Sequence, residues 1–551
     1  MIMSKITIIG LVLALSTVSW AGRQIELKTP TSVNTFESSG ITCPFQNDDN
    51  KNAVCQVKYR IKGSNQWQAG FPLWRDNKRQ EFRGSLVNLT PNTIYEVKLE
   101  VTDPDGPVPA KIFTVKTWSE TFPIAKTIII SGKALKDGYM INESGNAKGY
   151  ILYKTAPGTV IDVANKKATC LTVAAHHVII SGMTLNGAQR HAIRIMSGSD
   201  IIIEKCDISN WGSKLKDGWA RNMDCAVYSN YRPLARVIIQ RNKIHHPRYN
   251  SNNWQEPRPA MNNNPHPAGA QAVGFWDSAG NHVIRYNHVY SDPEHYYNDI
   301  FGCGANFSTK GFPNANTDIY GNILENCWDD AIETEGANNN VRVWGNYIEN
   351  AYKAHASRAT SVGPLYIWRN VCIIGYRNPN IQKGAAYHKS GGKRDRWDNG
   401  VFVFHNSAIM PSGNAVASSA TRGIEGAMLH TMTANNILNV EKSIISEVRK
   451  KNGSRFLNDL CSGKNYGMKF VKTVTSIKGY PRFTANFGLN RQTGKGNFQQ
   501  TPDSPGYNKG IKLPGFNTDV PDGKPDLGAH EAGTPPMEFG PKAYLRAVRR
   551  R

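Results

Sequence analysis

The segment Val341-Arg-Val-Trp-Gly-Asn-Tyr-Ile348 decides the fold, because its pattern returns through much of the chain. A short run of mainly β-branched residues is followed by asparagine or a small residue, and then by an apolar residue. The pattern recurs in residues 178–185, 201–208, 237–244, 283–289, 319–324, 365–371 and 401–407. Asn322, Asn346 and Asn370 lie 24 residues apart, while wider intervals separate Asn242, Asn287, Asn406 and Asn436.

Such a period, about 20–25 residues, is typical of a β-solenoid, in which stacked rungs bury a continuous apolar column. The repeated asparagines are expected to form a hydrogen-bonded ladder at one turn. Residues 125–440 resemble the right-handed parallel β-helix of pectate lyases, polygalacturonases, alginate lyases and chondroitinase B. The resemblance implies an all-β fold. A propeller is disfavoured, because propeller blades repeat at about 40–45 residues.

The residues before the repeats predict a separate all-β domain. Residues 24–118 contain short alternating strands with turn residues between them, as in a β-sandwich. The stretch from Leu86 to Val97 resembles the late strands of fibronectin type III domains, in which the residue matching Tyr95 makes the corner contact. Residues 441–551 are expected to form an irregular C-terminal cap that ends in a basic tail with four arginines.

Residues 1–21 predict export. They combine Lys5, an apolar run over residues 6–15 and a small-residue site at Ala21, which is the pattern of a bacterial signal peptide. We expect a secreted or periplasmic protein, with an uncleaved anchor as the alternative. No later run is apolar enough to span a membrane. In an oxidising compartment, Cys43 and Cys55 could form a local disulfide.

The charge of the chain points to a polyanionic partner. Lysine and arginine number 66 against 43 aspartates and glutamates, which gives a formal net charge of +23. Such an excess favours nucleic acid, an anionic membrane or an acidic polysaccharide. Export makes nucleic acid an improbable partner and leaves an acidic polysaccharide, uronate-containing or sulfated. A capped solenoid of this kind is expected to be a monomer.

The acidic segment Cys327-Trp-Asp-Asp-Ala-Ile-Glu-Thr-Glu-Gly336 departs most clearly from the repeat. With Ile332 pointing inward, Glu333 and Glu335 project from one face, about 7 Å apart. Together with Asp330 they would repel one another unless a cation or a shared proton relieves the charge. We therefore expect Asp330, Glu333 and Glu335 to bind Ca²⁺. The alternative is a solvated acidic rung.

Basic and aromatic residues gather on rungs near this segment. Counting one repeat forward places Lys353, His355 and Arg358 beside the carboxylates, as candidate catalytic residues. Candidate substrate-binding residues lie on earlier and later rungs and in the long insert before residue 267: His191, Arg194, Trp254, His388, Lys389 and Arg394. Trp254 is suited to stacking on a sugar ring.

These residues predict β-elimination on a uronate, in which the substrate carboxylate is neutralised, a proton is abstracted and the leaving oxygen is protonated. The Glu-x-Glu pair with an arginine one rung later resembles chondroitinase B and its alginate lyase relatives. That resemblance implies calcium ligation by Glu333 and Glu335, and proton donation by Arg358. Those enzymes place a lysine shortly after the pair; here Lys353 would have to be the base.

Two other functions fit the same residues. An inverting glycoside hydrolase needs two carboxyl groups about 6.5–9.5 Å apart, which Asp330, Glu333 and Glu335 could supply. A non-catalytic solenoid could bind a glycan through Lys389 and Arg394 without needing the acidic segment.

Overall fold

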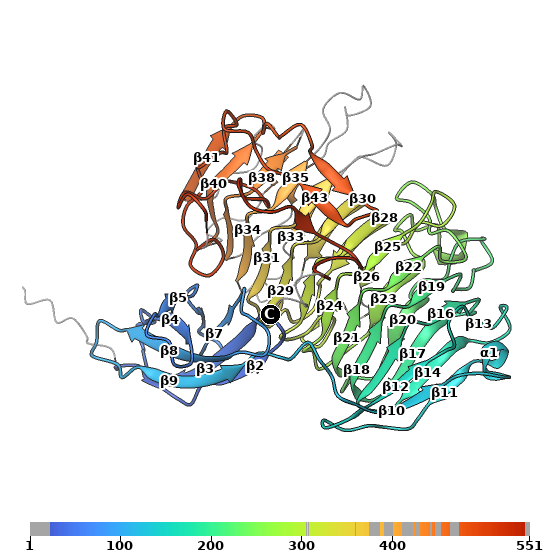
Figure 1. Ribbon diagram of the computed structural model, residues 1–551. Coiled ribbons are helices and arrows are strands. Elements are labelled where there is room, and N and C mark those ends of the chain that lie inside the picture. The colour runs from blue at the N-terminus through green and yellow to red at the C-terminus, as the bar shows by residue number, and fades with distance from the viewer. Residues whose placement is uncertain are drawn as a thin grey trace, which may run out of the picture.

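The computed structural model describes residues 23–545, except for 303, 305, 307, 359, 374–385, 391–399, 410–421, 426–429, 441–442, 447–452, 463–472 and 519. Two bodies make up the described chain: an N-terminal β-sandwich and a long coil of parallel strands (Figure 1). The predicted all-β fold, a right-handed parallel β-helix with an N-terminal β-sandwich, is confirmed. The helical elements are α1 (Ala134–Asp137) and a 3₁₀ turn at Pro259–Met261.

The sandwich consists of two antiparallel sheets around a shared apolar core that includes Val57, Phe82 and Val97. The first sheet contains β1 (Glu26–Leu27), β2 (Thr31–Asn34), β3 (Ser39–Gln46), β6 (Trp74–Asp76) and β7 (Glu81–Leu86). The second contains β4 (Val54–Ile61), β5 (Gln68–Ala69), β8 (Ile94–Thr102) and β9 (Lys111–Lys116). The predicted corner contact exists, because the Tyr95 hydroxyl accepts a hydrogen bond from the Thr90 backbone N–H at 2.8 Å.

The expected disulfide between Cys43 and Cys55 is wrong for this structure, in which both are free, buried thiols. Cys43 lies on β3 and Cys55 on β4, which belong to the two facing sheets. Each side chain is a small apolar part of the sandwich core.

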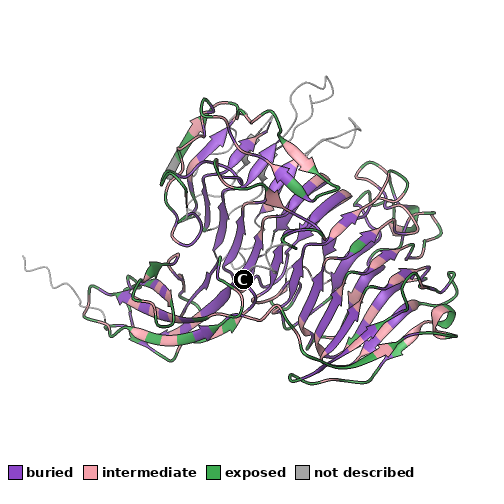
Figure 2. Ribbon diagram, viewed as in Figure 1, coloured by how far each residue is buried: buried purple, intermediate pink, exposed green. Residues whose placement is uncertain are grey.

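Each rung of the β-helix contributes to three parallel sheets. In sheet 1 the rungs are β10 (Ile124–Ile129), β12 (Tyr150–Lys154), β15 (Val178–Ser181), β18 (Ser199–Glu204), β21 (Ala235–Gln240), β24 (Val283–Arg285), β27 (Asp318–Tyr320), β29 (Val341–Trp344), β31 (Leu365–Trp368), β34 (Val401–Phe404), β37 (Thr431–Ala434), the start of β40 (Arg455–Cys461), and β41 (Thr473–Lys478). Figure 2 shows that most of the strand residues of the coil are buried.

Sheet 2 contains β13 (Val160–Asp162), β16 (Thr184–Asn186), β19 (Asp207–Ser209), β22 (Lys243–His245), β25 (His288–Tyr290), the starts of β28 (Ile323–Glu333) and β30 (Tyr347–Ser357), β32 (Val371–Ile373), β35 (Ser407–Ile409), β38 (Ile437–Asn439) and the end of β40. Sheet 3 contains β11 (Tyr139–Ile141), β14 (Thr169–Ala174), β17 (His191–Ser197), β20 (Cys225–Ser229), β23 (Gln271–Phe275), β26 (Phe301–Gly302), the ends of β28 and β30, β33 (Ala386–Ser390), β36 (Arg422–Glu425) and β39 (Ser443–Ser446).

A buried ladder of asparagine amides holds the rungs in register. At each step the side-chain oxygen of one asparagine accepts both the backbone N–H and the amide N–H of the asparagine one rung earlier, as between Asn322 and Asn346 at 3.1 and 2.9 Å. The ladder runs through Asn242, Asn287, Asn322, Asn346, Asn370, Asn406 and Asn436 and ends on the carboxylate of Asp459.

The coil extends past residue 440, where the sequence predicts a cap to begin. Parallel pairing continues through β39, β40 and β41 to Lys478. The predicted boundary falls short because Asp459 takes the place of the repeated asparagine on this rung. The asparagine repeat therefore ends in the sequence, while Asp459 still accepts the hydrogen bond from Asn436. Beyond the coil, β42 (Gly488–Asn490), β43 (Lys495–Asn497) and β44 (Met537–Glu538) form a small antiparallel sheet.

Other parts of the chain cover two of the three sheets. The outer face of sheet 1 packs against the sandwich and the C-terminal segment, through clusters that join Trp368 and Phe402 to Val87 and Phe516. The sandwich is also fixed by buried Arg83, which donates to the carbonyl oxygens of Val362 and Gly363. The outer face of sheet 2 carries aliphatic and aromatic residues that pack against Phe498 and Phe539. No apolar cluster of the described residues joins the outer face of sheet 3 to the sandwich or the C-terminal segment.

In the described part of the chain, no helix has both the length and the apolar character needed to cross a membrane.

We expect Asn346→Ala to lower the free energy of unfolding by at least about 3 kcal/mol, because it leaves the N–H groups of Asn322 and the carbonyl of Ile319 buried without partners. Denaturant unfolding followed by circular dichroism measures this loss. The control is Asn142→Ala, at an exposed position of the same β-helix, with an expected change below about 0.5 kcal/mol. Equal losses in the two variants would contradict a stabilising ladder.

Candidate active site

Strand register aligns the side chains of sheet 3 into columns. Leu171, Ile193, Val227, Val273, Phe301 and Ile332 form an inward column in the apolar core. The next residue on each rung points outward, which gives the column Thr172, Arg194, Tyr228, Gly274, Gly302, Glu333, Ala356 and Lys389. Because Gly302 and Ala356 flank Glu333, the carboxylate stands in a stretch with little side-chain bulk.

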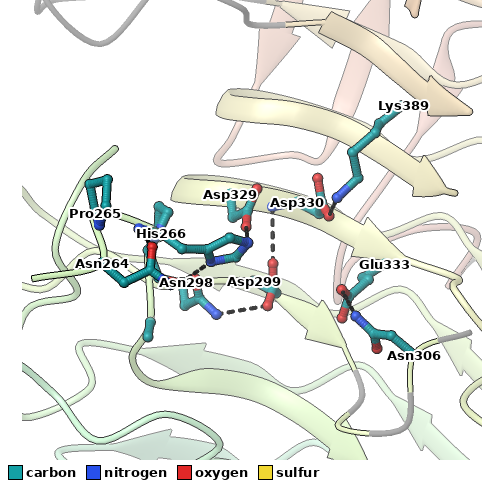
Figure 3. Close-up of polar contacts among 12 residues, drawn as sticks. Asn264, Pro265, His266, Asn298, Asp299, Asn306, Asp329, Asp330, Glu333 and Lys389 are labelled. Atoms are coloured by element: carbon teal, nitrogen blue, oxygen red, sulfur yellow. Dashed lines mark hydrogen bonds and ion pairs between the residues drawn. The ribbon is translucent and has the colours of Figure 1, made fainter. Parts of the chain in front are cut away.

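Three carboxylates from two neighbouring rungs meet on this face. Asp299 precedes β26, whereas Asp330 and Glu333 belong to β28. One oxygen of each lies within 4.8 Å of the others, and only 5, 0 and 6% of the three residues is exposed. We call Asp299, Asp330 and Glu333, together with the adjacent Asp329, the acidic cluster (Figure 3).

Amide groups hold part of the cluster in place. Asp299 accepts hydrogen bonds from the side chains of Gln271 at 3.0 Å and Asn298 at 2.8 Å, and from the Asp330 backbone N–H at 3.1 Å. The Asn306 amide donates to Glu333 at 2.8 Å. The space is tight, because a Cβ on Gly302 would lie 3.0 Å from Glu333 Oε2. A larger residue at this position would require these side chains to shift by a few tenths of an ångström.

The ammonium of Lys389, whose side chain is 20% exposed, neutralises part of the negative charge. Lys389 Nζ lies 2.5 Å from Asp330 Oδ2 and 3.1 Å from Glu335 Oε1. Burial opposes the charge of this ammonium, yet the surrounding carboxylates, Asp330 foremost, raise the pKa of Lys389 well above its usual value. Lys389 is therefore a cation that pairs with the acidic cluster and is not available as a base.

The aspartates of the cluster resist ionisation. Burial, followed by repulsion from neighbouring carboxylates, raises the pKa of Asp299 and of Asp329 well above the ordinary value. Burial also raises the pKa of Asp330, against the opposing effect of Lys389. Strongly perturbed carboxyl groups of this kind are common in active sites.

Asp329 differs from its neighbours in having few partners. Its Oδ1 has no hydrogen-bond partner among the described residues, and its Oδ2 lies 3.6 Å from His266 Nε2. His266 belongs to the long insert predicted to line the groove. In that insert Trp254 packs against His266 and Tyr352, with ring centroids 4.6 and 5.4 Å apart. The insert therefore brings an aromatic surface to the edge of the acidic cluster.

The structure changes the predicted metal set. Asp330 and Glu333 belong to the cluster as expected, but Glu335 lies beyond the end of β28 and pairs with Lys389. Asp299, from the preceding rung, takes the third place. The sequence offers one signal for it: Asp299-Ile-Phe301 aligns with Asp330-Ala-Ile332, 31 residues later, but the long loops around it hide the repeat.

The three candidate catalytic residues on and after β30 lie in different surroundings. Lys353 is the register partner of Asp330, and its ammonium lies 4.6 Å from the centroid of the Tyr352 ring. Arg358 follows the end of β30 and is exposed. His355 is the register partner of Ile332, so its side chain continues the inward column.

His355 and His388 face the interior, which corrects their expected place in the groove. Strand register pairs them, their rings are 5.0 Å apart, and the Ser357 hydroxyl lies 2.9 Å from His388 Nε2. Burial lowers the pKa of His355 far below its usual value and that of His388 to about 3. The count of 24 residues found the correct rung for His355. After the irregularity between Cys327 and Asp330, however, the register is 23 residues, so His355 pairs with the inward residue Ile332. His388 pairs with His355 and therefore faces inward as well.

The remaining predicted substrate-binding residues lie at different distances from the cluster. Arg194 occupies the outward column four rungs before Glu333, roughly 19 Å away at the usual strand spacing. His191 stacks on Tyr228 with ring centroids 4.0 Å apart, and burial lowers its pKa to about 3. Trp254 borders the cluster. Arg394 lies outside the described residues.

Comparison with known proteins adds little. Neither a family model nor a curated protein matches the chain. Among solved structures, the catalytic unit of a thermostable GH87 α-1,3-glucanase from Streptomyces thermodiastaticus strain HF3-3 aligns with 85% of this chain and 89% of its own, at 11% identity and a TM-score of 0.34. This similarity is too low to transfer a reaction or a residue role.

We expect Asp329→Asn to raise the free energy of unfolding at pH 8 by about 1–3 kcal/mol, and by less at pH 4. The pKa values of these aspartates are raised in the folded protein, so folding favours the protonated carboxyl groups. Their contribution to stability is therefore complete below the pKa of an unfolded aspartate, about 3.9. It is lost as the pH rises through the folded-state pKa values. Thermal and denaturant unfolding at both pH values measure the difference.

The control for this measurement is Asp162→Asn, which changes an exposed aspartate of the same β-helix and should shift stability by less than about 0.5 kcal/mol at either pH. A loss of stability at pH 8 in Asp329→Asn would mean that this carboxylate is a stabilising structural group.

Proposed function

We propose that the protein is a secreted glycoside hydrolase that cleaves a polysaccharide lying along sheet 3. The observation that carries the proposal is the acidic cluster: buried carboxyl groups with raised pKa values on sheet 3, which no apolar cluster of the described residues joins to the sandwich or the C-terminal segment. Hydrolysis of a glycosidic bond needs one carboxyl group that holds a proton near neutral pH and one that is ionised.

Asp329 is the general acid in this proposal. Burial and repulsion from Asp330 keep it protonated, and among the described residues no N–H group occupies its Oδ1. Its proton passes to the glycosidic oxygen as the bond from that oxygen to the anomeric carbon breaks. Trp254, at the edge of the cluster, packs against the sugar on one side of this bond.

Asp330 is the general base. Lys389 favours its ionised form, and the backbone N–H of Asp330 fixes Asp299 beside it. A water molecule between these two carboxyls loses a proton to Asp330 while its oxygen bonds to the anomeric carbon. Asp330 is paired with Lys389, and Asp299 accepts three N–H groups, so neither carboxyl group is free to attack the anomeric carbon itself. We therefore assign the attack to water, and direct attack by water predicts inversion at the anomeric carbon.

The substrate class follows from charge and compartment. The net charge of +23, together with Lys353 and Arg358 on the rung beside the cluster, favours an acidic polysaccharide. The signal-peptide pattern of residues 1–21 supports a secreted or periplasmic enzyme.

β-Elimination is the second candidate, favoured by Lys353 and Arg358 lying next to three clustered carboxylates. Calcium would assist by neutralising a uronate, but the cluster does not fit the ion in this arrangement. Calcium takes six to eight oxygen ligands, some of which can be water, and carboxylates supply most of its charge neutralisation. Here Asp330 is paired with an ammonium, and Asp299 and Glu333 accept N–H groups.

We expect Asp329→Asn and Asp330→Asn each to lower kcat by about 10²–10⁴-fold, because each removes a proton-transfer group without removing bulk. Asp162→Asn is the control and should keep full activity. The assay measures new reducing ends released from a panel of acidic and neutral polysaccharides, together with absorbance at 232 nm. Reducing ends should appear without a rise in absorbance.

An EDTA-sensitive rise at 232 nm would contradict hydrolysis and establish the lyase, since elimination creates an unsaturated uronate. No cleavage of any polysaccharide, with binding retained, would leave a non-catalytic glycan-binding solenoid.

We expect Lys389→Met to move the acidic limb of the pH profile of kcat/KM to higher pH. The ammonium lowers the pKa of Asp330 against the effect of burial, so its removal raises that pKa and demands a higher pH for the ionised base. Initial rates from pH 4 to 9 locate the limb. An unchanged limb would mean that Asp330 is not the base.

A further inference from the structure

A cavity lies where the sandwich meets the β-helix. Its volume is about 720 Å³, within the range of small-ligand sites, which often form at domain interfaces. Residues from three parts of the chain line it: Glu37 and Asn92 from the sandwich, Tyr286 and Trp344 from the β-helix, and Glu538 and Tyr544 from the C-terminal segment. We call it the junction cavity.

We propose that the junction cavity binds a short neutral oligosaccharide. This site goes beyond the proposed function, since it lies at the turns between sheets 1 and 2 while the acidic cluster lies on sheet 3. It would act as an accessory binding site that holds a glycan to the enzyme away from the cleaved bond.

The wall of the cavity combines rigid aromatic rings with hydrogen-bonding groups. Tyr320 and Trp344 stack with centroids 4.0 Å apart and an interplanar angle of 9°, and Trp368 continues the stack at 4.7 Å. Around these rings stand the carboxyl groups of Glu37, Glu120 and Glu538. Sugars present both apolar C–H faces and hydroxyl groups, so a mixed lining of this kind is suited to them.

The charge of the lining favours a neutral ligand. Three glutamates, Glu37, Glu120 and Glu538, line the cavity, against one arginine, Arg241, which donates to the carbonyl oxygens of Pro541 and Ala543. Glu120 also accepts from Arg285, behind the lining residues, at 2.8 Å. A uronate would therefore meet more carboxyl groups than cations among the lining residues. Hydroxyl groups can donate to the same carboxylates.

The backbone conformation of the coil suggests a substitution that would fill the cavity. The residue just before each ladder position has a left-handed backbone conformation. It is glycine at positions 321 and 345 and a larger residue on other rungs, for example Arg241, Tyr286 and Arg369. Gly345 is such a glycine, with a φ of 58°, and it lines the cavity with nothing within 4 Å of the position its Cβ would take. A tyrosine is already tolerated at this conformation, at Tyr286.

The test is Gly345→Tyr, which places a ring in the cavity while using a residue the coil already accepts. Its matched control is Gly182→Tyr, since Gly182 has a φ of 69°, nothing within 4 Å, and a position on an earlier rung outside the cavity. Thr90→Trp narrows the cavity from the sandwich side as a second occluding change. Circular dichroism and thermal unfolding check that each variant folds.

Isothermal titration calorimetry measures binding of neutral hexasaccharides of glucose, xylose and mannose, and of hexagalacturonate, to the full chain. Asp330→Asn is the background, so that bound sugars are not cleaved. We expect one neutral hexasaccharide to bind, with affinity at least about tenfold weaker in Gly345→Tyr and in Thr90→Trp and unchanged in Gly182→Tyr. Trp344 fluorescence should change on binding.

Three outcomes would overturn the proposal: no neutral hexasaccharide binds, the occluding variants bind neutral sugars as well as the control does, or Gly345→Tyr and Thr90→Trp weaken the binding of hexagalacturonate instead of that of a neutral sugar. None of them bears on hydrolysis at the acidic cluster, whose own test uses cleavage.

Discussion

The asparagine ladder is the interaction on which the rest of the structure depends. Seven asparagines and Asp459 exchange hydrogen bonds along the buried edge of the coil, so a rung cannot slip without leaving several N–H groups unpaired. The fixed register places Asp299 beside Asp330, and aligns Glu333 with Lys389 two rungs later. A cluster of carboxyl groups drawn from separate rungs can exist only on a scaffold with this precision.

The acidic cluster is costly to the fold. Burial and mutual repulsion disfavour ionisation of its aspartates, and Lys389 offsets part of that cost by pairing with Asp330 and Glu335. A solvated acidic rung would have exposed side chains, free to separate. Here the carboxyl groups are buried, and amide groups hold Asp299 and Glu333 in place beside Gly302.

The sequence predicts the scaffold better than the site. A repeat of 24 residues between Asn322, Asn346 and Asn370 leads directly to a parallel coil, and Glu333 follows from strand alternation once Ile332 faces the core. Counting by repeats fails where strands are irregular: the count of 24 placed His355 beside the carboxylates, but after Cys327 the register between β28 and β30 is 23 residues, so His355 pairs with Ile332 and faces inward. Asp299 was missed because long loops interrupt the repeat around it, and the strand pairing that brings it to Asp330 is a property of the folded coil.

The central claim is that Asp329 holds a proton at neutral pH while its neighbour is ionised. Infrared difference spectra between the wild-type protein and Asp329→Asn at pH 7 test it directly, with Asp162→Asn as the reference. The account predicts a protonated carboxyl band in the wild-type spectrum that disappears in Asp329→Asn and persists in Asp162→Asn. Loss of an ionised carboxylate band instead would show that Asp329 is charged and would contradict its role as the acid.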